Sequence, residues 1–399
     1  MKIVFLAGRP LPSPTALWRR IGFFARYFQE RGHDVRVVGV FSLKDLGEAP
    51  GRYARYGRAH RNGVKIINVD TFSSLGLLVP LLVLLRPDVV VTSVPPGRPI
   101  PFAYLAAKIL ETKLVIDYRD EWEDYMLGRS TSRTVRSLLS RLKSWMTQLY
   151  RESDWVVTVT ANLVDNLRAR GLDRVGLVPN GVDLRVFRPH ARTATRERLG
   201  LGADDIALIH SGTIGEYYRL DIVIRAIARL PEKLRRRVKL VLAGRGGNLP
   251  SLKALAQRVG LPDTILHLGV LNDTARLAEV LSAADLGLVP HDASPLWKNA
   301  LPAKFFEYSA CGLPTLANAF EDSMLATLMK ERDLGEATPP LDEKRLSERI
   351  AALARDTNRR KRLGENARRT MAALFDRRAI TEEFLRDVSA LVENTGQPS

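Results

Sequence analysis

Short apolar runs alternate with helical segments along most of the chain. The pattern begins with a predicted strand over residues 2–7, an amphipathic helix over 15–31 and a second strand over 35–40. Strands that alternate with helices predict a parallel sheet that is covered by helices on both faces. Further strands of this series are expected over residues 64–69, 89–92, 113–117, 155–158 and 175–178.

A turn-rich segment over residues 179–189 separates this series from a second one. At 399 residues the chain is also long for a single domain. We therefore expect an α/β protein with two Rossmann-like, doubly wound domains that face each other across a cleft lined by the carboxyl ends of both sets of strands. The expected parts are a first domain over 1–185, a second over 186–375 and a C-terminal helix over 376–399 that packs back towards the first. The second series of strands is expected over residues 206–210, 238–243, 265–268, 286–289 and 315–317.

The net charge of +17, with a pI of about 10.2, implies an anionic partner such as nucleic acid, acidic lipid or a phosphorylated substrate. The sequence has no zinc-finger spacing, RNA-binding aromatic signature or basic-region heptads, so we do not expect a nucleic-acid partner. The one cysteine, Cys311, lies on the apolar side of a predicted helix, where packing is its expected role. Because there is no Asp-x-Asp and the six histidines lack ligand spacing, we expect no metal and no cofactor.

The longest apolar run, residues 75–85, is too short to span a bilayer and is expected to form a buried helix. The chain opens on a predicted strand and not on a signal peptide, so we expect a cytoplasmic protein. Residues 133–151 combine apolar side chains at helical spacing with Arg and Lys around them. This pattern fits either a helix that lies on an anionic membrane or a packed domain helix. The basic run over 52–61 fits either a charged surface or a solvated loop.

The most informative polar pair is Lys304 and Glu307, which belong to a predicted helix that begins at Pro302 and stops before Gly312. Three residues apart, the two side chains share a face near the positive end of the helix dipole. A helix start with a lysine can hold a phosphate, and a carboxylate one turn later can accept from two sugar hydroxyls. A surface ion pair is the other interpretation of this spacing.

Two loops in the first half follow predicted strands. Residues 8–15 form a Gly/Pro/Ser loop that is either a plain connection or a contact for an acceptor or a phosphate. Arg119 and Asp120 follow the strand over 113–117. Asp120 could accept or orient an acceptor hydroxyl, although an Asp–Arg pair at a strand end is often a structural bridge.

Four motifs occur in a fixed order along the chain: Pro179-Asn-Gly-Val-Asp183, His210-Ser-Gly-Thr-Ile-Gly215, Leu242-Ala-Gly-Arg-Gly246 and Pro302-Ala-Lys-Phe-Phe-Glu-Tyr308. In order and spacing they resemble the retaining GT-B glycosyltransferases of family 4, also called glycosyltransferase group 1. The resemblance covers nearly the whole chain. In the N-terminal half, residues 92–96 and 117–122 look like segments of members that extend surface polysaccharides or lipid-linked glycans.

The resemblance implies a metal-independent hexosyltransferase that moves a sugar from a nucleotide-diphosphate donor to a glycan or lipid-linked acceptor with retention. The family places the donor diphosphate against a glycine-rich loop and two basic side chains, which stabilise the leaving group as its charge grows. Glu307 matches the ribose-binding glutamate of the family, whereas Asn299 stands where a first glutamate is expected and Thr213 stands where many relatives have arginine. Arg245 is either a further phosphate contact or part of a solvated turn.

The expected site residues fall into three groups. They are Asp120, Arg219 and Lys304 for catalysis; Gly212, Thr213, Gly215, Arg245, Asn299, Pro302 and Glu307 for donor binding; and Gly8, Arg9, Thr15 and Arg119 on the acceptor side. Such a protein would act in polysaccharide biosynthesis, and a peripheral position at the cytoplasmic face of the membrane would fit that role. Two alternatives stay open: a nucleotide-sugar epimerase of the same architecture, and a non-catalytic scaffold that binds polyanions.

Overall fold

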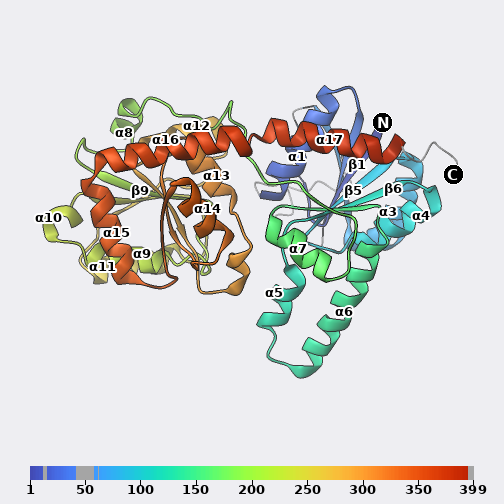
Figure 1. Ribbon diagram of the computed structural model, residues 1–399, viewed down its shortest axis with the longest axis horizontal. Coiled ribbons are helices and arrows are strands. Elements are labelled where there is room, and N and C mark those ends of the chain that lie inside the picture. Colours follow the sequence, from blue (N-terminus) through green and yellow to red (C-terminus); the bar gives the residue numbers. More distant parts are fainter. Residues whose placement is uncertain (12–15, 42–57, 62, 394–399) are drawn as a thin grey trace. The chain divides into compact units, whose positions relative to one another are not determined.

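The computed structural model describes residues 1–11, 16–41, 58–61 and 63–393. The chain forms two compact units (Figure 1). Unit 1 comprises Met1–Pro179 together with the chain from Arg378 onward, and unit 2 comprises Asn180–Arg377. Each unit is built around one sheet.

Among the described residues, unit 1 has an eight-stranded sheet in the order β3-β4-β2-β1-β5-β6-β7-β8. All neighbouring strands are parallel except β3, which pairs antiparallel with β4 at the edge. The strands are β1 (Lys2–Ala7), β2 (Asp34–Phe41), β3 (Arg58–Arg61), β4 (Val64–Asp70), β5 (Val89–Val94), β6 (Lys113–Tyr118), β7 (Trp155–Thr158) and β8 (Val175–Leu177).

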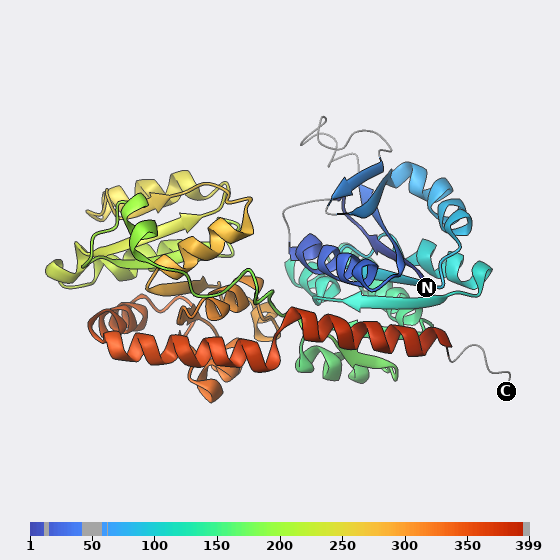
Figure 2. The same cartoon turned by 90° about the horizontal axis from the view of Figure 1, so that it is seen from above.

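The unit 1 helices cover both faces of this sheet. They are α1 (Ala16–Glu30), α3 (Thr71–Leu85), α4 (Ile100–Leu110), α5 (Trp122–Arg129), α6 (Arg133–Arg151), α7 (Ala161–Ala169) and α17 (Arg377–Glu393). Side chains alternate between two cores, since Ile3 and Phe5 of β1 pack with α1 and α17 while Val4 and Leu6 pack with α3, α4 and α6. Figure 2 shows α17 running along unit 1, where Phe384 meets the aromatic rings of α1.

Unit 2 has a six-stranded parallel sheet in the order β11-β10-β9-β12-β13-β14, counted over the residues that the structure describes. The strands are β9 (Ile206–Ser211), β10 (Val238–Ala243), β11 (Ile265–His267), β12 (Leu286–Pro290), β13 (Thr315–Asn318) and β14 (Gly335–Thr338). The helices are α8 (Thr193–Arg198), α9 (Leu220–Ala228), α10 (Glu232–Arg235), α11 (Leu249–Arg258), α12 (Thr274–Ala283), α13 (Ala303–Ala310), α14 (Met324–Arg332), α15 (Glu343–Arg355) and α16 (Thr357–Leu374), with a short 3₁₀ helix, η1, over Pro295–Lys298.

The two Rossmann-like sheets confirm the expected fold class, and every strand predicted above is present to within two residues at each end. The edge strands β3 and β14 were not predicted, because their sequences, RAHR and GEAT, carry no apolar alternation. The helix expected to be buried over 75–85 is buried on one side only: Leu78 and Leu82 are buried, but Leu84 is 80% exposed. None of the described helices combines the length and apolarity needed to cross a bilayer.

Candidate functional site at the carboxyl edge of the unit 2 sheet

The strand order of unit 2 changes direction between β9 and β12. Within the domain the order is third, second, first, fourth, fifth and sixth, so the connections run to opposite sides of this strand pair. Open parallel sheets bind their ligands outside the carboxyl ends of the strands at such a switch point. Here the two strands end at Ser211 and Pro290, so the loops that start at Gly212 and His291 share this edge.

The loops that follow β9 and β10 are locked together through their backbones. Gly212 N–H donates to the Ala243 carbonyl at 2.9 Å, and Ile214 N–H donates to the Arg245 carbonyl at the same distance. A Cβ on Gly244 would lie 1.7 Å from the Gly212 carbonyl oxygen, and a Cβ on Gly246 would lie 2.0 Å from that of Ile214. Only glycine permits this approach, so both glycines are required for the shape of the edge.

Lys304 brings a buried cation to this edge from the first turn of α13. Its side chain is 6% exposed, and its Nζ lies 3.2 Å from Nε2 of His210 and 3.5 Å from the centre of the Tyr218 ring. The same Nζ lies 3.9 Å from the position that a Cβ on Gly212 would take. The ammonium is therefore next to the glycine loop, where the face of an aromatic ring stabilises it.

Two histidines beside Lys304 are neutral. Burial and the nearby Lys304 ammonium lower the pKa of His291 to about 3 and hold the pKa of His210 well below its usual value. His210 keeps a contact of 3.0 Å between Nε2 and the Thr213 carbonyl. Because both imidazoles lack a charge at neutral pH, the positive charge of this cluster belongs to Lys304.

An aromatic stack borders the cation. The rings of His291 and Trp297 are stacked with centroids 4.0 Å apart, and Tyr218 lies 5.5 Å from His291. Trp297 is fixed in turn by the Asp292 carboxylate, which accepts from its Nε1 at 2.5 Å. Nε2 of His291 is buried and has no hydrogen-bond partner among the residues that the structure describes. Sequence pattern alone does not single out Tyr218, His291 or Trp297, although each lies in a loop that follows a strand end.

Glu307 lies one turn after Lys304 on α13 and is 2% exposed. Since both side chains are buried, a surface ion pair is the wrong interpretation of their spacing. Helix α13 starts directly after Pro302, whose extended backbone turns the chain into the helix. The hydroxyl of Tyr308, on the same helix, accepts from the Ser211 N–H at 2.9 Å and so ties α13 to the end of β9.

The Arg219 side chain is engaged by a carboxylate. Its guanidinium forms a bidentate pair with Asp221, with distances of 2.8 and 2.7 Å. Together with Arg225, Asn248 and Arg258 it lines a depression at α9 and α11 to which neither Lys304 nor His210 contributes. The other expected donor residues lie on the loops described above: Thr213 and Arg245 are exposed, and Gly215, Asn299 and Pro302 are partly buried.

In unit 1, the strand order changes direction between β1 and β5, and two of the expected acceptor residues, Gly8 and Arg9, directly follow β1. Gly8 is buried against the loop that follows β5, where a Cβ would meet the Pro96 carbonyl oxygen at 2.5 Å, while Arg9 is exposed. Arg119 donates to the Pro95 carbonyl at 2.7 Å, and Asp120 is exposed. Thr15 lies outside the described residues.

Asp117, near the end of β6, forms a structural bridge. The buried Asp117 carboxylate accepts from Arg20 of α1 at 2.9 Å and from the Ser93 hydroxyl at 2.8 Å. Arg20 also donates to the carbonyls of Val178 and Pro179, which end the first long segment of unit 1. Local sequence pattern does not indicate this long-range pair, since its partners are 97 positions apart.

Comparison with known families agrees with this architecture. Residues 191–370 match the family described as "Glycosyl transferases group 1", and residues 18–186 match "Glycosyltransferase Family 4". The chain therefore carries a domain of each of these two glycosyltransferase families.

Individual relatives match about half of the chain. The chain is 34% identical over 231 residues to a D-inositol 3-phosphate glycosyltransferase of Xylanimonas cellulosilytica. This alignment covers 55% of this chain and 53% of the relative. A protein of the same name from Mycobacterium tuberculosis is 32% identical over 210 residues, covering 49% of this chain and 42% of the relative. The chain thus spans about half the length of the curated relatives it matches.

Solved structures share the fold over the whole chain. Anabaena Alr3699/HepE in complex with UDP-glucose is 18% identical, with a TM-score of 0.73 over 98% of this chain and 100% of that one. Sucrose-phosphate synthase from Thermosynechococcus elongatus is also 18% identical, with a TM-score of 0.75 over 98% and 99%. These likenesses confirm the GT-B fold class.

We expect Gly244→Ala and Gly246→Ala each to destabilise unit 2 by about 2 kcal/mol or more, because the added methyl must push the two loops apart. Gly247→Ala is the matched control, since a Cβ there meets nothing within 4 Å and should change stability by less than about 0.5 kcal/mol. Scanning calorimetry of the three variants measures the difference. Equal melting temperatures for all three would contradict the locked-loop geometry.

The neutral histidines predict a pH-dependent stability of unit 2. Unfolded histidine titrates near pH 6.5, whereas folded His291 stays neutral down to a pKa of about 3, so below pH 6.5 the unfolded chain binds more protons. The free energy of unfolding should then decrease as the pH is lowered below 6.5, by up to about 1.4 kcal/mol per pH unit for each such histidine. His291→Phe keeps the ring stack and should reduce this slope between pH 6 and pH 4.5. Urea titrations read out by hydrogen exchange of β9 and β12 test this, and an unchanged slope would refute it.

Proposed function

We propose that this chain is a retaining, metal-independent glycosyltransferase that moves a hexose from a nucleotide-diphosphate donor to a glycan or lipid-linked acceptor. The observation that carries the proposal is the buried Lys304 ammonium beside the Gly212 loop at the switch point of unit 2. The two family matches support glycosyl transfer, and the UDP-glucose complex of Alr3699/HepE supports a nucleotide sugar as the donor. Neither the epimerase nor the scaffold alternative is favoured by the comparisons.

In this proposal, unit 2 binds the donor. Lys304 and the N-terminal end of α13 hold the diphosphate, whose charge grows as the glycosidic bond breaks, so a fixed cation contributes most in the transition state. Glu307 accepts hydrogen bonds from the nucleotide ribose, and Asn299 binds a hydroxyl of the hexose. Gly212, Thr213, Gly215 and Pro302 shape this site. Arg219 and Arg245 are the candidates for a second cation.

Unit 1 supplies the acceptor side of the proposed reaction. Gly8, Arg9 and Arg119 lie at its own switch point and would contact the acceptor. Asp120, which is exposed, orients the attacking hydroxyl. With retention on one face of the donor, the leaving phosphate takes the hydroxyl proton, so the reaction does not require a protein base. Asp117 is held by Arg20 and has a structural role.

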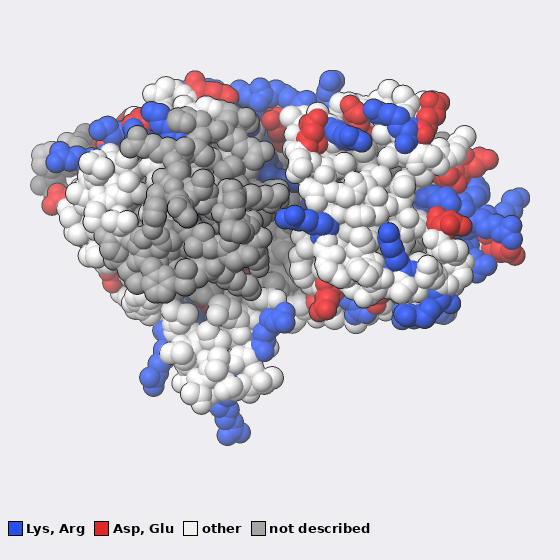
Figure 3. All heavy atoms as spheres, turned by 180° about the vertical axis from the view of Figure 1, so that it is seen from behind, with Lys and Arg blue, Asp and Glu red and all other residues white. Residues whose placement is uncertain are grey.

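A lipid-linked acceptor fits a peripheral position on an anionic membrane, for which α5 and α6 are the proposed contact. These helices project from unit 1 (Figure 1), and Figure 3 shows Lys and Arg atoms among uncharged ones on the projection. Val135, Leu138 and Trp145 of α6 are 46%, 67% and 50% exposed, whereas Met146 and Leu149 are buried. The first part of the helix is thus available to a bilayer surface, and its last turns are packed.

We expect Lys304→Ala and Glu307→Ala each to weaken UDP binding at least tenfold, about 1.4 kcal/mol, because each removes a charged donor contact. Lys298→Ala is the matched control, since the side chain of this lysine is 39% exposed and is paired with Asp322. Titration calorimetry measures affinity, and circular dichroism verifies the fold. Unchanged affinity in both variants would overturn the donor site. Donor turnover without an added acceptor would instead indicate an epimerase.

For the membrane contact, we expect the double variant Leu138→Glu, Trp145→Glu to bind phosphatidylglycerol vesicles at least fivefold less, since it places two carboxylates on the proposed contact face. Leu177→Glu serves as the control, because Leu177 is 49% exposed but belongs to β8. Co-sedimentation with vesicles gives the bound fraction. If the double variant and the control bind equally, α6 is not the membrane contact.

A further inference from the structure

A second basic site lies at the opposite edge of the unit 2 sheet. It is a cavity of about 730 Å³ between α16 and the amino ends of β12 and β13, which start just after Asp285 and Pro314. Strand β12 has five residues, so about 15 Å of strand separates this edge from the carboxyl edge that carries Lys304. The cavity is lined by other residues than the donor site.

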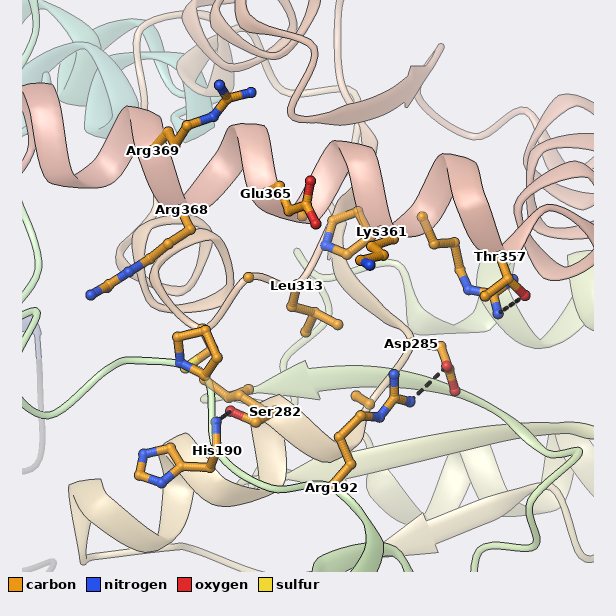
Figure 4. A pocket seen from close by; sticks show the side chains of 18 residues that line it. His190, Arg192, Ser282, Asp285, Leu313, Thr357, Lys361, Glu365, Arg368 and Arg369 are labelled. Atoms are coloured by element: carbon orange, nitrogen blue, oxygen red, sulfur yellow. Dashed lines mark hydrogen bonds and ion pairs between the residues drawn. The ribbon is translucent and has the colours of Figure 1, made fainter.

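One face of α16 forms a wall of the cavity. Thr357, Lys361, Gly364, Glu365 and Arg368 recur at helical spacing along it. Figure 4 shows Lys361 and Arg192 directed into the space between α16 and the strand ends, whereas Arg369 turns away. A Cβ on Gly364 would lie 2.1 Å from the Gly312 carbonyl oxygen, so the backbones of α16 and of the segment after α13 are in direct contact here.

The cavity carries more positive than negative charge. Arg192, Arg360, Lys361 and Arg368 line it, against the carboxylates of Asp285 and Glu365. Asp285 is already shared, since Arg192 contacts it at 2.8 Å and Arg196 at 3.1 Å.

Arg360 lies in the same crowded surroundings. Burial lowers the pKa of Arg360; the Asp285 carboxylate opposes this shift, and the guanidiniums of Arg192 and Arg196 add to it. Its Nη1 also donates to the carbonyls that end α15, so its position is fixed. A bound anion would relieve the repulsion among these cations.

We propose that this cavity is a second anion site that binds a phosphoryl group, carried either by a phosphorylated small molecule or by a lipid headgroup. Guanidinium and ammonium groups are the donors that phosphate oxygens accept from most strongly. The volume is in the range of small-molecule sites, and Leu281 and Leu313 provide an apolar floor. The site is separate from the donor site, so its ligand does not compete with the nucleotide for the same side chains.

The test uses inorganic pyrophosphate as the probe and the full chain with Lys304→Ala, which removes the cation of the proposed donor site. In this background we expect Lys361→Glu to weaken pyrophosphate binding at least tenfold. Lys344→Glu is the matched control, because Lys344 is also exposed on a unit 2 helix but does not line the cavity, and it should change affinity less than twofold. Titration calorimetry at constant ionic strength gives the affinities, with melting temperatures to verify folding.

Two outcomes overturn the proposal: equal binding by the Lys361 and Lys344 variants, or no saturable binding of pyrophosphate in the Lys304→Ala background. Because the donor cation is absent in every sample, these outcomes are independent of the proposed function. A second arm identifies the source of the phosphoryl group. If Lys361→Glu also lowers binding to phosphatidylglycerol vesicles relative to Lys344→Glu, the cavity takes a lipid headgroup; if only pyrophosphate binding falls, it takes a soluble phosphorylated molecule.

Discussion

The backbone contact between the loops after β9 and β10 is the constraint on which the carboxyl edge of unit 2 depends. No Cβ fits on Gly244 or Gly246, and the hydrogen bonds that start at Gly212 and Ile214 hold the two loops in one register. The position of Gly212 is therefore set by β10 as well as by its own strand. The Tyr308 hydroxyl bonds α13 to the end of β9, so the helix that carries Lys304 is held at the strand end from which the Gly212 loop starts.

Placing an ammonium in this buried edge costs desolvation energy, and the surroundings of Lys304 are chemically suited to reduce that cost. The face of Tyr218 and a neutral His210 stabilise a cation without cancelling its charge. The effect is mutual, because the ammonium is one reason why His210 and His291 stay neutral. Water is scarce at this edge, and there the attraction of the ammonium for a phosphate is stronger than on an exposed surface.

The sequence was sufficient for the described strands other than the edge strands β3 and β14, and for the α13 pair, because these follow from local pattern: apolar runs, a proline at a helix start and a three-residue spacing. It did not reveal Tyr218, His291 and Trp297 as one stack, since two different loops bring them together only after the sheet has formed. It also did not show that Asp221, two positions further on, engages the guanidinium of Arg219. A nearby carboxylate competes for an arginine in a way that motif spacing does not show. The Arg20–Asp117 pair was missed because it joins distant segments.

The two edges of the unit 2 sheet handle positive charge differently, and this difference separates their chemistry. At the carboxyl edge, one buried cation is fixed by rings and a neutral imidazole, an arrangement that favours a single oriented ligand. At the amino edge, Arg192 and Arg196 share the Asp285 carboxylate beside an open cavity, an arrangement that favours anion binding with less demand on orientation. The net charge of +17 therefore does not describe one uniformly basic surface. Part of the positive charge lies at two separate places on unit 2. Helix α13 connects them, because Lys304 lies in its first turn, whereas Cys311 and Gly312, which follow its last turn, line the second cavity.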